Sequence, residues 1–122
     1  MSVLAYLFCG SIIGVIGFQI ALILGAPWGR ITQGGQHEGA LPTTGRLAAA
    51  ISVVLLMAIA LAILSAAGGW PGWPRWSGWA ATALMGIIVV LNWVTPSSAE
   101  RRLWGPITSV MFALSLSVML FG

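Results

Sequence analysis

The sequence contains no lysine, one histidine, one cysteine and only two acidic residues. The single cysteine, Cys9, excludes an internal disulfide and a paired-cysteine metal or redox motif. His37 is the only side chain suited to act as a base near neutral pH, and no motif places a nucleophilic hydroxyl beside it. The five basic residues are arginines that form no basic run, which argues against nucleic-acid binding. These absences favour a non-enzymatic protein without a cofactor.

Charge of either sign is scarce, and apolar residues dominate instead. Charged residues make up 6% of the chain and hydrophobic ones 59%. Soluble domains carry roughly 25% charged residues, so this chain could not cover its surface in water. Four uncharged apolar runs stand out: residues 3–25, 47–68, 78–94 and 106–122. Each has the roughly 17 to 25 residues that cross a bilayer, and spans in lipid must be helical to satisfy their backbone groups. We therefore predict one domain, an all-α four-helix transmembrane bundle in a lipid bilayer.

The arginines predict the orientation of this bundle. Four spans leave three loops, of which the first and third lie on the same side of the membrane. These two longer polar loops hold four of the five arginines, and the middle loop holds only Arg75. Basic residues are enriched in cytoplasmic loops. Both termini are therefore expected on the outside and the arginine-bearing loops in the cytoplasm.

The third loop, NWVTPSSAERRLWGP, carries a helix start signal. Ser97 and Glu100 have the spacing of a capping box, in which the serine side chain accepts a hydrogen bond from the amide three residues later. A helix is therefore expected to begin near Ser98, ahead of the fourth span. Pro106 cannot donate to the carbonyl of Arg102, so we expect a kink or a break at Pro106.

Small residues line one face of the first span. Gly10, Gly14, Gly17 and Ala21 are spaced by four, three and four residues, and Gly10-x-x-x-Gly14 is a motif that lets helices approach closely in lipid. The stripe is interpreted first as packing within the bundle. It could also form an interface between copies or with a larger membrane complex.

The spans contain no ionisable residue, and their only strongly polar residues are Gln19 and Asn92. An acid inside a span is the usual device of proton-coupled exporters, so its absence counts against that mechanism. Gln19 and Asn92 are expected either to bond to each other between helices or to line a path for a substrate.

The remaining polar candidates are expected together at the cytoplasmic end, around the loop GGQHEGALP: Arg30, His37, Glu38, Arg46, Glu100, Arg101 and Arg102. We predict a packed polar cap in which Glu100 pairs with an arginine, because unpaired charge is costly at the edge of a low-dielectric layer. The arginines, with exposed amides of Gly34 and Gly35, could also hold an anion such as a lipid phosphate. A metal site is disfavoured because the neighbours His37 and Glu38 would point apart.

The middle loop, GGWPGWPRWSGW, repeats tryptophan every three residues. Tryptophan settles at the membrane interface, where its ring is half buried and its N–H is hydrated. The loop is therefore interpreted as an aromatic belt that anchors a short hairpin.

The stretches PWGRITQGGQHEGALPTTGR and PSSAERRLWGP resemble those of small bacterial four-helix membrane proteins that have no assigned function. The resemblance implies a four-span protein of the bacterial inner membrane and brings no substrate or site residue. Two functions stay open. The first is a subunit or scaffold that acts through helix packing, alone or as a homo-oligomer. The second is a small oligomeric transporter or channel.

Overall fold

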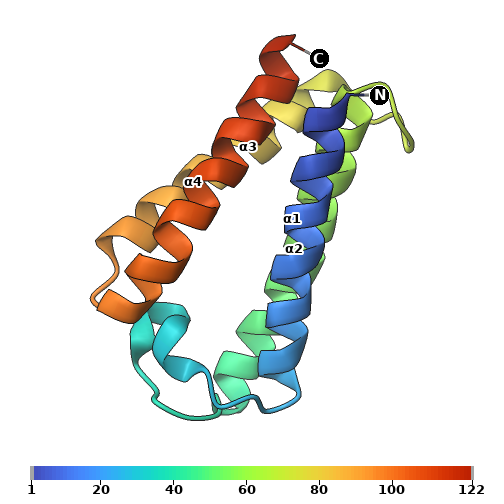
Figure 1. The fold of residues 1–122 in the computed structure, drawn as a ribbon. Coiled ribbons are helices and arrows are strands. Elements are labelled where there is room, and N and C mark those ends of the chain that lie inside the picture. The colour runs from blue at the N-terminus through green and yellow to red at the C-terminus, as the bar shows by residue number, and fades with distance from the viewer. Residues whose placement is uncertain (1, 122) are drawn as a thin grey trace.

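The computed structural model describes residues 2–121 and is all-α in that range (Figure 1). Its four long helices are α1 (Val3–Ile23), α2 (Thr43–Ala66), α3 (Arg75–Val94) and α4 (Ser98–Phe121). All four are long and apolar enough to cross a membrane, which confirms the predicted four-helix class. The loop between α1 and α2 contains two short 3-10 helices, η1 (Gly29–Ile31) and η2 (Gln33–Gly35).

The helices form two hairpins that meet at one end of the bundle (Figure 1). α1 packs along α2, and α3 packs along α4. The hairpins converge at the tryptophan end, which holds both termini and the loop 67–74. They separate toward the arginine end, where the first loop, residues 24–42, crosses below the helices. Which end faces the cytoplasm stays a prediction.

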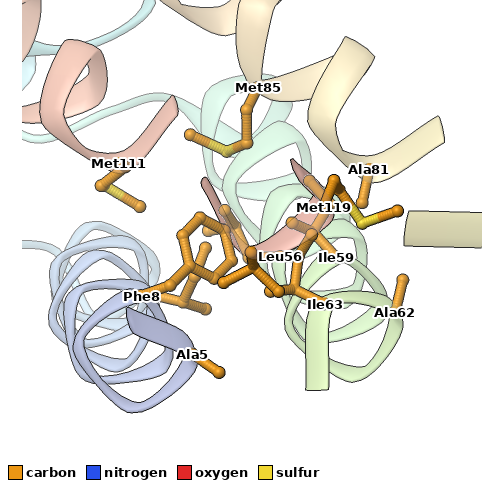
Figure 2. Packing of buried hydrophobic residues seen from close by; sticks show 12 residues of the cluster. Ala5, Phe8, Leu56, Ile59, Ala62, Ile63, Ala81, Met85, Met111 and Met119 are labelled. Carbon is orange, nitrogen blue, oxygen red and sulfur yellow. The ribbon is translucent and has the colours of Figure 1, made fainter. Parts of the chain in front are cut away.

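The larger hydrophobic cluster occupies the converging half and the middle of the bundle, and a smaller one of Leu22, Leu41 and Ala49 lies at the arginine end. Figure 2 shows Phe8 projecting from α1 toward Leu56 and Ile63 of α2, while Met85 of α3 and Met111 of α4 extend into the same space. All five side chains are at least nine-tenths buried. They come from the tryptophan-end halves of α1, α2 and α4 and from the middle of α3. This cluster therefore closes the tryptophan end, and the space between the hairpins at the arginine end is bordered by other residues.

α4 begins where the capping box predicts. The side-chain oxygen of Ser97 accepts a hydrogen bond from the Glu100 amide at 3.1 Å, and the helix starts at Ser98. Of the kink or break expected at Pro106, the break is wrong, since α4 continues through Pro106 to Phe121. Proline removes one backbone bond, and Pro106 is exposed on the helix surface, where its ring displaces no packed neighbour. One missing bond is tolerated in a helix whose other bonds stay intact.

The glycine stripe on α1 does not pack within the bundle. Gly10, Gly14 and Gly17 are all exposed, and a β-carbon added at any of them would meet no atom within 4 Å. The expectation of packing inside the bundle is therefore wrong for these three glycines. Helix α1 instead buries Ala5, Phe8 and Ile12 against the core. The stripe is left facing outward from the bundle.

Candidate functional site

Glycines shape the first loop into a compact turn. The Gly29 amide donates to the Gly39 carbonyl at 3.0 Å, and a β-carbon at Gly29 would lie 2.1 Å from the His37 carbonyl oxygen. Gly35 has a φ of 68°, and a β-carbon there would lie 2.6 Å from that of Ser97. No side chain fits at either position, so the loop can fold back and approach α4 with its backbone.

Three hydrogen bonds join this loop to α4. The Ser97 hydroxyl donates to the Arg30 carbonyl at 2.6 Å. The indole N–H of Trp104 donates to the Ile31 carbonyl at 2.8 Å, and the Gly34 amide donates to the Glu100 carboxylate at 3.3 Å. The first loop is therefore fixed as a floor across the open arginine end.

Aromatic rings connect the two hairpins just above this floor. Phe18 of α1 stacks on Trp28, with ring centroids 5.6 Å apart, and meets the edge of Trp104 of α4 at 4.8 Å. Aromatic pairs of this geometry stabilise by about 0.5–1.5 kcal/mol beyond their buried area. Trp28 and Trp104, each of which is followed by a glycine in the sequence, thus both pack on Phe18.

A cavity lies between these aromatic rings and the hydrophobic core. It has a volume of about 210 Å³ and takes residues from all four helices and the first loop. Its polar lining residues are Gln19, Thr32, Ser52, Asn92, Glu100 and Thr108. A second space of about 510 Å³ adjoins it and shares five of these, all but Thr108. We call the two spaces together the interhelical cavity.

Glu100 is the one ionisable residue that lines the interhelical cavity. The residue is 7% exposed, and its Oε2 atom accepts the bond from Gly34. Its other oxygen, Oε1, accepts no protein hydrogen bond among residues 2–121 and is accessible to water, since no buried side-chain oxygen there lacks a partner. The sequence placed Glu100 in a loop ahead of the membrane, whereas the structure buries it between the helices.

The predicted pairing of Glu100 with an arginine is wrong. Two of the arginines at this end bond to backbone oxygens instead: Arg46 donates to the Leu41 carbonyl at 2.9 Å, and Arg101 donates to the Thr95 carbonyl at 3.1 Å. Arg102 is exposed. The first and third loops do pack together as expected, but hydrogen bonds to backbone groups of the first loop hold them. The glycines allow the loop backbone to lie directly against the carboxylate.

Gln19 of α1 and Asn92 of α3 come from diagonally opposite helices, and both line the interhelical cavity. They form no hydrogen bond with each other in the part of the chain that is described. The Asn92 amide nitrogen instead donates to the Ile88 carbonyl at 2.8 Å, one turn earlier in its own helix. The two residues thus occur as polar lining rather than as a pair between helices.

His37 and Glu38 lie at the exposed edge of the loop, away from this cavity. Glu38 and Arg30 border a shallow groove of about 380 Å³ beside the start of α4. The Gly34 amide already donates to Glu100 and the Gly35 amide to the Thr32 carbonyl at 2.8 Å. These two amides are therefore already used within the protein. Anion binding by the arginines alone at this groove stays a prediction. Across residues 2–121 no three His, Cys, Asp or Glu side chains are grouped.

Sequence reasoning missed that Glu100 faces inward. Glu100, Trp104 and Thr108 follow one another at intervals of four residues, which places them on one face of α4. All three line the interhelical cavity. This spacing was a usable signal, although the rotation of α4 that turns the face inward depends on packing with the other helices. Comparison with protein-family models, curated proteins and solved structures gave no match.

Proposed function

We propose that this chain is a small membrane transport protein, in which the interhelical cavity receives a small polar solute. The cavity itself carries the proposal, because all four helices contribute to its lining and Gln19, Asn92 and Glu100 all face it. Polar groups between membrane helices cost free energy and are usually present for function. A protein that acted through helix packing alone would fill this space with apolar side chains.

The shape of the bundle favours a carrier over an open channel. The hydrophobic core closes the tryptophan half, and the interhelical cavity lies in the arginine half above the first loop. A site that is closed on one side corresponds to a single state of an alternating-access cycle. Passage would require the two hairpins to separate at the tryptophan end. In the bacterial inner membrane, with the arginine end in the cytoplasm, the site would load from the cytoplasmic side.

The second candidate is a subunit or scaffold in a larger assembly. It is supported by the outward-facing stripe of Gly10, Gly14 and Gly17, since small residues allow close helix association in lipid. The two functions are compatible if the transporter is a homo-oligomer that uses this face.

Solute flux into proteoliposomes tests the proposal. The probes are glycerol, urea, methylammonium chloride and sodium acetate, each followed by light scattering after an osmotic step. We expect flux of at least one probe above empty liposomes, and loss of that flux in Ser52→Phe, which fills the interhelical cavity. The matched control Ala113→Phe, on the exposed face of α4, should keep it. Equal flux in both variants, or none for any probe, would favour the subunit function.

A further inference from the structure

We propose that the interhelical cavity is a binding site for a small organic ammonium ion, with Glu100 as its counter-ion. This inference rests on the proposed function only where it treats the bound ion as a transported solute; the binding of the ion is argued from the lining residues alone. The chain has a formal charge of +3, yet the one charged residue in the cavity lining is an acid. The cavity is thus a negative site inside a positive protein, and it disfavours anions.

The Glu100 carboxylate keeps one oxygen accessible and without a protein partner. It is 7% exposed, accepts one backbone bond through Oε2, and leaves Oε1 toward the cavity without a partner among residues 2–121. A buried carboxylate is costly unless it is paired and hydrogen-bonded. Arg46 and Arg101, which could have paired with it, bond to carbonyls elsewhere. A cation entering the cavity would pair with the accessible oxygen in place of water.

The other polar groups of the cavity include several acceptors. The amide nitrogen of Asn92 donates to Ile88, and its Oδ1 oxygen bonds to no protein group in the described chain. The hydroxyls of Ser52 and Thr108 donate to carbonyls of their own helices at 3.0 Å and 2.6 Å, which leaves their oxygens to accept. Gln19 adds an amide that can both donate and accept. These acceptors, together with the Glu100 carboxylate, suit a ligand that donates, as an ammonium group does.

Apolar and aromatic walls distinguish an organic ammonium from a bare metal ion. Phe18 and Trp104 line the cavity together with Leu55, Leu56 and Ile88. Aromatic rings attract cations, and the aliphatic side chains can cover an alkyl group but cannot coordinate a metal. The larger of the two spaces, about 510 Å³, falls within the usual size of ligand sites, roughly 300–1,000 Å³. The ammonium could come from a free amine or from an ethanolamine lipid headgroup.

Binding of isobutylammonium chloride tests the site. The intact protein is placed in phosphatidylglycerol nanodiscs, which contain no amine, and binding is measured by calorimetric titration. We expect saturable binding of isobutylammonium and none of isobutanol, its neutral counterpart. Glu100→Gln should bind roughly ten- to hundredfold more weakly, the usual loss for a charge-assisted hydrogen bond. Glu38→Gln, which removes the exposed acid outside the cavity, should bind as the wild type does.

Three results would overturn the inference: equal binding in Glu100→Gln, equal binding of isobutanol, or displacement of the amine by equimolar sodium chloride, which would indicate an inorganic cation site. If Glu100→Gln fails to fold, Asn92→Leu serves instead. It removes an acceptor whose only protein bond lies within its own helix, and binding should still weaken.

A parallel titration in phosphatidylethanolamine nanodiscs separates the two sources of the ammonium. Weaker apparent amine binding there indicates that the lipid headgroup occupies the site, and unchanged binding indicates a free amine. Amine binding without flux in proteoliposomes would support this site and contradict transport. Flux without amine binding would support transport and contradict this site.

Discussion

Single glycines decide how the arginine end is built. Gly29 and Gly35 bring the first loop so close to itself and to α4 that no β-carbon fits. This close approach aims the Gly34 amide at Glu100 and holds one carboxylate oxygen in place. The acid at the cavity thus depends on loop residues that carry no functional group of their own.

The effect is testable with two neighbouring glycines. Gly29→Ala should destabilise the protein by about 1–3 kcal/mol, the range for forced overpacking, because its β-carbon would lie 2.1 Å from a backbone oxygen that cannot rotate away. Gly39→Ala is the control, since a β-carbon there meets nothing within 4 Å. The measurement is thermal unfolding in mild detergent. Equal melting temperatures would mean that the loop does not pack as described.

At the scale of the helices, close packing occurs between α3, α4 and α2 rather than along the stripe on α1. A β-carbon at Gly78 of α3 would lie 2.6 Å from the sulfur of Met119 and 3.0 Å from the β-carbon of Ala66. Gly78 is buried, whereas Gly14 is exposed. The glycine that brings helices together is therefore one outside the stripe on α1.

Two leucine substitutions separate these roles. Gly78→Leu should lower the melting temperature strongly, because the larger side chain forces three helices apart. Gly14→Leu should leave the melting temperature of the monomer unchanged. If α1 associates through its stripe, Gly14→Leu should instead reduce the mass of the assembly measured intact in detergent. Strong destabilisation of the monomer by Gly14→Leu would contradict the outward orientation of the stripe.

The four helices illustrate which features could be predicted from the sequence and which could not. Hydropathy and length depend on each segment alone, so the four helices were predictable, and so was the start of α4, because Ser97 caps locally. The direction of a helix face depends on its neighbours. Gly10, Gly14 and Gly17 were therefore expected inside and lie outside, while Glu100 was expected at the edge and is buried. The effect of Pro106 was overestimated, since one lost bond does not end a long apolar helix.

For the whole molecule, the main feature is the contrast between its two ends. Apolar side chains fill the space where the hairpins converge, and a folded loop with a few polar residues closes the space where they separate. A polar cavity could not be predicted from the sequence, because its lining comes from all four helices and a loop, and each contributes only three or four residues with no motif.

The orientation of the two ends in the membrane decides from which side the cavity is reached. Four of five arginines lie at the end with the first and third loops, so the positive-inside rule predicts that this end is cytoplasmic. Two cysteine variants in a Cys9→Ala background test this, Glu38→Cys and Trp73→Cys. Both positions are exposed, and they lie in the first loop and the middle loop.

A membrane-impermeant maleimide applied to intact cells should label Trp73→Cys at once. It should label Glu38→Cys only after the membrane is opened. The reverse pattern would place the arginine end outside, and labelling of both in intact cells would mean that the chain inserts in two orientations. Because the loops are short and a single arginine, Arg75, opposes the bias, one dominant orientation is expected. With that orientation the interhelical cavity, which Glu100 lines, would lie in the cytoplasmic half of the bundle.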